Sequence, residues 1–147
     1  MQKKVLFNNG ELAWETRAFP VSTDITGSLG VVETGSDIGF NVNRVFFLRD
    51  IDSTAVRGMH SHAELKQLII CLSGSFEITL DCLKEKETFT MTSNDFSLYL
   101  DGKVWRTMAK FSQDAVMLVL CDKEYELDRV VRDYDEFKNI MLVSDEE

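Results

Sequence analysis

The chain has 147 residues, 44% of them hydrophobic, and a formal net charge of −9 at pH 7. This charge argues against a nucleic-acid-binding protein, which needs a basic surface, but it allows an anionic small ligand held by a few arginines. The longest apolar stretches, such as residues 115–121, are far too short to span a bilayer, so we expect no membrane partner. Three widely spaced cysteines are typical of a reduced protein and predict a cytoplasmic location.

Short segments rich in Val, Ile, Phe, Thr and Leu alternate with turn residues along most of the chain. We predict two or three strands before residue 44, one of them at 29–33, and further strands at 44–48, 66–72, 75–81, 87–91, 96–100 and 115–121. Turns are expected at 73–75, 93–95 and 101–103. Only residues 134–142 have helical spacing, with Asp133 as a candidate cap. This pattern predicts one all-β domain, residues 1–147, built as an antiparallel sandwich or barrel with a short C-terminal helix.

The two histidines of the chain, His60 and His62, are separated by one residue. A strand would place both side chains on the same face, roughly 7 Å apart at about 3.3 Å per residue. Such a pair is suited to metal binding or to proton transfer, because the unperturbed pKa of histidine lies near 6.5. The alternative is a structural role, with both rings hydrogen-bonded in a polar sheet face.

The residues that follow the pair resemble the first motif of the cupin superfamily. His60, His62, Gln67 and Gly74 have the spacing of that motif, in which the position of Gln67 is usually glutamate. Metal-binding cupins add a third histidine in a second motif, and Trp105 stands at that position here. An indole N–H only donates hydrogen bonds, and a neutral amide is a weaker ligand than a carboxylate. The resemblance therefore favours proton transfer, with no metal and no cofactor.

A longer series of segments is similar to the WxcM-like cupins, which include the sugar 3,4-ketoisomerases. The similar region covers about two-thirds of the chain, from Arg44 to Phe137, and its strongest parts are Arg57-Gly58-Met59-His60-Ser61-His62 and Trp105-Arg106. The resemblance implies a cupin jelly-roll β-barrel or sandwich. It also implies a cytoplasmic, metal-independent homodimer that converts dTDP-4-keto-6-deoxyglucose to a 3-keto isomer. This reaction supplies 3-amino sugars for surface glycans such as the lipopolysaccharide O-antigen.

The two histidines have the chemistry that such an isomerisation needs. Moving the ketone from C4 to C3 requires removal of the C3 proton, an enediol, and protonation at C4, while protons also move between the two oxygens. We assign His60 to the carbon and His62 to the oxygens, although the sequence leaves the order open.

Six further residues are candidates for substrate binding. A planar guanidinium suits phosphate oxygens, so Arg57 and Arg44 are candidates for the diphosphate or the enediolate, against the alternative of surface arginines. Arg106 is expected at the rim of the pocket, where it would hold the sugar and influence which face of C4 is protonated. Gln67 would bond the substrate or a histidine. Tyr99 would carry a proton and Trp105 would stack on sugar or base, unless these two residues only pack in the core.

The sequence also departs from the family pattern. Phe46 and Phe47 stand where relatives often have a tyrosine, and Thr26 replaces an arginine in a segment ending at Leu29. The substrate and the configuration at C4 of the product, gluco or galacto, therefore stay open. Two other functions also remain: a sugar-nucleotide epimerase, with Tyr99 as the proton donor on the opposite ring face, and a non-catalytic cupin that binds a sugar nucleotide.

Overall fold

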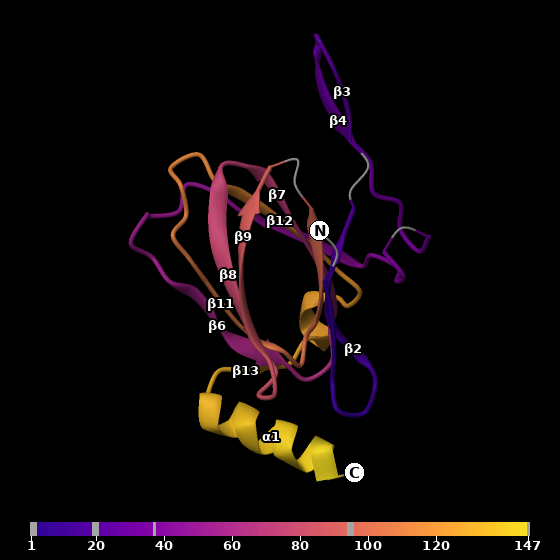
Figure 1. The fold of residues 1–147 in the computed structure, drawn as a ribbon, viewed down its shortest axis with the longest axis vertical. Helices are drawn as coiled ribbons and strands as arrows, with labels where there is room; N and C mark the ends of the chain where they lie inside the picture. Colours follow the sequence, from indigo (N-terminus) through magenta and orange to yellow (C-terminus); the bar gives the residue numbers. More distant parts are fainter. Residues whose placement is uncertain (1–2, 19–20, 37, 94–95, 147) are drawn as a thin grey trace.

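A computed structural model describes residues 3–18, 21–36, 38–93 and 96–146. Two antiparallel sheets face each other across the core (Figure 1). In spatial order, the first sheet contains β1 (Lys4–Leu6), β2 (Leu12–Arg17), β10 (Ser97–Asp101), β7 (Lys66–Ser73), β12 (Val116–Cys121) and β5 (Arg44–Leu48). The second sheet contains β13 (Val130–Val131), β6 (Arg57–His62), β11 (Trp105–Ala109), β8 (Ser75–Asp81) and β9 (Lys86–Thr92).

Alternating side chains of the two sheets form the core. In β8, Phe76, Ile78 and Leu80 are fully buried while the residues between them are partly exposed, as expected for a strand with one face on the core. Strand β7 is instead buried on both faces along most of its length. Its outward residues, Leu68 and Ile70, belong to a second apolar cluster on the outer face of the first sheet.

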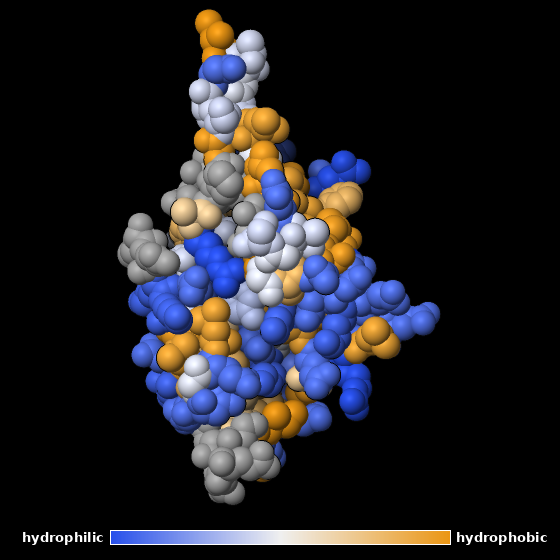
Figure 2. Space-filling model, turned by 90° about the vertical axis from the view of Figure 1, so that its right-hand side faces the viewer, coloured by the Kyte–Doolittle hydropathy of each residue, from blue (hydrophilic) through white to orange (hydrophobic). Residues whose placement is uncertain are grey.

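Two elements extend from this sandwich at opposite ends. Strands β3 (Val21–Asp24) and β4 (Gly27–Gly30) form a separate hairpin that projects at the top of Figures 1 and 2, with Ile25 fully exposed in its turn. Helix α1 (Tyr134–Glu146) covers the other end and buries Phe137 and Met141. Neither this helix nor the short 3-10 helix η1 (Tyr125–Leu127), the two helices of the described ranges, is long and apolar enough to cross a membrane.

The prediction of an all-β fold with a C-terminal helix is confirmed. The six strands predicted after residue 43 are present, each within one residue of its expected ends. The predicted cap is also correct, because a carboxylate oxygen of Asp133 accepts hydrogen bonds from the backbone N–H groups of Asp135 and Glu136, at 2.8 and 3.3 Å. The helix is longer than predicted, and part of the turn expected at residues 93–95 lies outside the described residues.

The strand expected at residues 29–33 is mostly wrong. Strand β4 ends at Gly30, and residues 31–33 are not in a strand. Val32 packs instead against the apolar cluster on the outer face of the first sheet. One of the apolar residues that suggested a strand, Val32, therefore covers a sheet, while Leu29 and Val31 are exposed.

Candidate active site

A cavity of about 460 Å³ lies between the two sheets. Its walls come from β5, β7 and β12 of the first sheet, from β6 and β11 of the second, and from residues 125–132. One part of the wall is apolar and consists of Phe46, Leu48, Ile69, Met108, Met117 and Val119. Charged interactions inside such a site are stronger than in water, because the surroundings have a low effective dielectric constant.

A β-bulge in β6 directs the two histidines into this cavity. Arg106 of β11 pairs with His60, and the next residue pairs with Gly58, so Met59 has no partner in the register. Gly58 has φ of +82°, and a Cβ atom there would lie 2.9 Å from the carbonyl oxygen of Arg106. The sequence Gly58-Met59 before the pair therefore permits a bend that a larger residue at 58 would resist.

The two imidazole rings contact each other directly. Their Nε2 atoms lie 3.1 Å apart, and the rings meet edge to face with centroids 4.8 Å apart. His62 is only 6% exposed, whereas His60 is partly exposed. The prediction that the pair shares one face of a strand is confirmed by this contact.

Asp128 completes the group and was missed by the sequence analysis. One of its carboxylate oxygens lies 2.6 Å from Nδ1 of His62, and the other accepts a hydrogen bond from Nη2 of Arg44 at 3.0 Å. The residue follows η1, and two residues later β13 pairs with β6 through Val130 and His62. No motif in the sequence marks Asp128, which is 66 positions from His62.

Arg106 lies inside the protein and not at the rim, where the sequence analysis expected it. It is 2% exposed, and its guanidinium donates to the backbone carbonyls of Gly102 and Val104 and to Oε1 of Gln67. The amide nitrogen of Gln67 in turn donates to Sγ of Cys121 at 3.5 Å. Arg106 therefore supplies a fixed positive charge beside the histidines, because its donors are already used by the protein.

Burial and this positive charge keep both histidines neutral. Burial lowers the pKa of His62 to about 3, with a further contribution from the charge of Arg106. The same two causes, in the same order, lower the pKa of His60. Burial alone would raise the pKa of Asp128, but hydrogen bonds from Arg44 and His62 outweigh it and lower that pKa overall. At pH 7 the group therefore contains two neutral imidazoles and one carboxylate.

The neutral state of His62 predicts an acid-sensitive fold. Because the folded pKa of about 3 lies below the ordinary value of 6.5, the unfolded chain binds this proton first as the pH falls. The stabilisation is complete above pH 6.5 and is lost progressively toward pH 3, by at most about 1.4 kcal/mol per pH unit. Urea unfolding between pH 7 and 5, above the range of ordinary carboxyl groups, measures this slope. We expect a shallower slope for His62→Asn, and an unchanged slope would contradict the prediction.

Arginines on the open wall give the cavity an anion-binding character. Arg57 and Arg132 both line it, are exposed, and form no ion pair with the described residues. Arg44 also lines it but is paired with Asp128. Arg57 was expected from the sequence. Arg132 was missed, although it lies in the segment 132–134 that the family resemblance includes.

Two of the predicted site residues lie elsewhere. Tyr99 is on the outer face of the first sheet, because its neighbours Leu98 and Leu100 point into the core, and it packs against Phe40 and Arg17. Trp105 packs against Tyr134 and Phe137 of α1, with ring centroids 5.2 and 5.5 Å away. Neither residue lines the cavity between the sheets.

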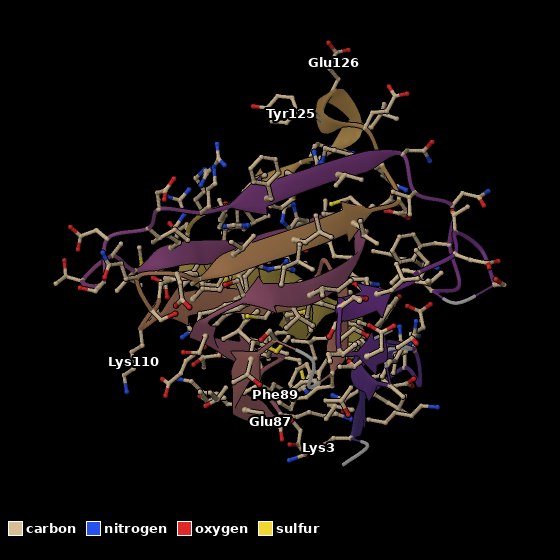
Figure 3. The ribbon with its side chains drawn as sticks, turned by 90° about the horizontal axis from the view of Figure 1, so that it is seen from above. Lys3, Glu87, Phe89, Lys110, Tyr125 and Glu126 are labelled. Carbon is tan, nitrogen blue, oxygen red and sulfur yellow. The ribbon has the colours of Figure 1, made fainter. Side chains whose placement is uncertain are left out.

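Tyr125 lines the cavity and was also missed. It is 79% exposed and belongs to η1, which lies at the periphery of the fold next to β5 (Figure 3). Tyr125 lies 63 residues after His62 in a short loop helix, and no sequence pattern predicts that it reaches the cavity.

The chain is similar in sequence to proteins of one family. Residues 13–142 match the family described as FdtA: WxcM-like, C-terminal. The TDP-4-oxo-6-deoxy-alpha-D-glucose-3,4-oxoisomerase of Aneurinibacillus thermoaerophilus is 36% identical over 115 residues, which are 78% of this chain and 83% of that protein.

Solved structures agree with the sequence match. The 3,4-ketoisomerase QdtA of Thermoanaerobacterium thermosaccharolyticum, as a histidine-to-asparagine variant in complex with TDP-4-keto-6-deoxyglucose, is 31% identical with a TM-score of 0.84, covering 93% of this chain and 96% of that one. The TDP-quinovose 3,4-ketoisomerase WlaRB of Campylobacter jejuni is 34% identical with a TM-score of 0.79, covering 84% and 95%. The RmlC epimerase of Mycobacterium tuberculosis is only 15% identical and shares the fold alone. The chain belongs to the FdtA family of WxcM-like proteins.

Proposed function

We propose that this protein is a sugar-nucleotide 3,4-ketoisomerase that converts dTDP-4-keto-6-deoxyglucose to a dTDP-3-keto-6-deoxyhexose. The observation that carries the proposal is the neutral pair His60 and His62, whose Nε2 atoms lie 3.1 Å apart in a cavity with arginines on its wall. Membership of the FdtA family also supports this proposal, since relatives that act on TDP-linked keto sugars are more than 30% identical to this chain.

Two neutral imidazoles can carry out the proton transfers of this reaction. His60 takes the proton from C3, and the electron pair of that bond forms the C3–C4 double bond while the C4 ketone oxygen gains a proton. His62 moves protons between the two oxygens, so that the C3 hydroxyl loses its proton as the ketone forms there. His60 then gives to C4 the proton that it took from C3, which completes a balanced isomerisation with no oxidant and no metal ion in any step.

The surroundings of the pair support the same chemistry. The buried charge of Arg106 stabilises the negative charge that develops on the enediolate oxygens, and it does so in an apolar, preorganised setting. Arg57 and Arg132 are the arginines available for the diphosphate, because neither is paired with another described side chain. Gln67 holds Arg106 in place rather than the sugar.

The remaining parts of the proposal concern the setting of the enzyme. We infer that residues 1–147 form one catalytic domain without a cofactor, and that the protein is a cytoplasmic homodimer in deoxy-amino-sugar synthesis. Three buried, unpaired cysteines support a reducing compartment. Within the described ranges, no group of three or more His, Cys, Asp or Glu residues is arranged to hold a metal ion.

Incubation with dTDP-4-keto-6-deoxyglucose, followed by ¹³C NMR of the product, tests the reaction. We expect the ketone carbon signal to move from C4 to C3, with full activity after treatment with a chelator. Binding without turnover would instead identify a sugar-nucleotide sensor. Inversion of a centre without a ketone shift would identify an epimerase, whose candidate donor Tyr99 lies outside the cavity.

A further inference from the structure

A continuous chain of polar contacts connects His60 to His62, Asp128 and Arg44. We propose that Asp128 is a positioning residue for the isomerisation: it holds His62 as the Nδ1–H tautomer, so that the Nε2 lone pair of His62 accepts protons in the cavity. This inference rests on the proposed function for its effect on turnover, but the tautomer itself is a property of the free protein.

Both oxygens of Asp128 are used. The side chain is 5% exposed, with one oxygen 2.6 Å from Nδ1 of His62 and the other 3.0 Å from Nη2 of Arg44. A carboxylate has no hydrogen to donate, and a guanidinium has no acceptor. The contact with His62 is therefore a hydrogen bond only if Nδ1 carries the proton. Arg44 fixes the carboxylate in its plane and keeps it ionised.

This tautomer determines the state of the second ring. Once Nδ1 of His62 is protonated, its neutral ring has a lone pair at Nε2, and the 3.1 Å contact requires Nε2 of His60 to donate. In the free protein the lone pair of His60 is then on the buried Nδ1 atom, so its role as the base at C3 requires this ring to change to the Nδ1–H tautomer once substrate separates the two rings. When His62 takes up a proton at Nε2, its Nδ1–H group stays bonded to the carboxylate of Asp128, which stabilises the cation.

An asparagine at position 128 would reverse this arrangement. The guanidinium of Arg44 can only donate, so the amide oxygen would face Arg44 and the amide N–H₂ would face His62. Nδ1 of His62 must then accept, and the proton moves to Nε2. His62 thereby loses its acceptor nitrogen in the cavity, and Nε2 of His60 becomes the acceptor of the contact between the rings, although the size of the side chain at position 128 is unchanged.

The test compares Asp128→Asn with the matched variant Asp81→Asn. Asp81 is also buried, and its two oxygens accept hydrogen bonds from Leu83 N–H and the Tyr134 hydroxyl, at 2.8 and 2.6 Å. It does not line the cavity between the sheets. We expect Asp128→Asn to lower kcat about 100-fold or more with KM little changed, because it removes one general base. Asp81→Asn should leave kcat at the wild-type level.

¹⁵N NMR of the histidine rings separates a positioning role from a structural one. The chain has only two histidines, so four ring nitrogens report the tautomers. In the wild type we expect a protonated Nδ1 and an unprotonated Nε2 for His62, exchanged in Asp128→Asn. The second substitution Arg44→Met removes the donor that orients the amide of Asp128→Asn. The double variant should regain the wild-type tautomer of His62, and its kcat should be at least tenfold higher than that of Asp128→Asn alone.

Each outcome bears on one of the two proposals. A wild-type protein without ketoisomerase activity would contradict the proposed function, while the tautomer in the free protein would still decide the role of Asp128. Wild-type kcat in Asp128→Asn, or an Nε2–H tautomer of His62 in the unmodified protein, would overturn the inference. The tautomer of His62 in the unmodified protein can be measured even if Asp128→Asn does not fold.

Discussion

Replacing His60 with asparagine should lower kcat for the ketoisomerisation by about 10²–10⁴-fold, the usual contribution of a general base. The variant should fold, since His60 is partly exposed and asparagine is also a polar side chain that can donate and accept hydrogen bonds there. Turnover is measured by NMR of the keto-sugar product. Met59→Leu, an exposed change on the same strand, is the matched control and should retain full activity.

Hydrogen exchange in D₂O distinguishes the roles of the two histidines. If His60 acts on carbon, His60→Asn should lose exchange of the C3 hydrogen of the substrate. His62→Asn should retain some of that exchange but fail to complete the ketone shift, because proton movement between the oxygens is impaired. The opposite pattern would exchange the roles assigned to the two histidines. If His60→Asn kept an activity within tenfold of the wild type, His60 would be excluded as the base.

Arg106→Ala should lower the free energy of unfolding by about 1–3 kcal/mol for each buried acceptor that it leaves without a donor. The substitution leaves the buried Oε1 of Gln67 and the buried carbonyl of Val104 without their donor, while the carbonyl of Gly102 still accepts the backbone N–H of His62. Urea denaturation monitored by tryptophan fluorescence measures the loss.

Arg57→Ala is the matched control for this loss. Arg57 is exposed, so we expect a change in unfolding free energy within about 0.5 kcal/mol, but a clearly raised KM for the sugar nucleotide. The two arginines thus separate stability from substrate binding. Equal stability of Arg106→Ala and the wild type would show that the guanidinium is not needed to satisfy these acceptors.

The sequence predicts those features that depend on short-range patterns. The strand positions follow from alternation and turn residues, and the histidine pair follows from the two-residue period of a strand. Arg106 was predicted as a site residue but at the wrong depth, because a sequence does not show that backbone carbonyls and Gln67 satisfy a buried guanidinium. Tyr99 was an attractive proton carrier, yet the register of β10 turns it to the outer face.

The features that were missed depend on long-range contacts. Asp128 reaches His62 only because β13 pairs with β6, a contact between segments about 70 positions apart. Arg132 and Tyr125 come to the cavity through the same segment. Acidic and aromatic residues near the end of a chain are common, so their types alone carry no information about the site.

The way this last segment is attached has a consequence for how the enzyme loses activity. Residues 122–131 contain a single turn of helix with no buried residue and a strand of two residues, and Figure 3 shows the turn at the periphery. Local openings of this kind need less free energy than unfolding of the core sheets. Mild heat or low urea should therefore detach Asp128 while both sheets persist, and catalysis should fail before the loss of secondary structure.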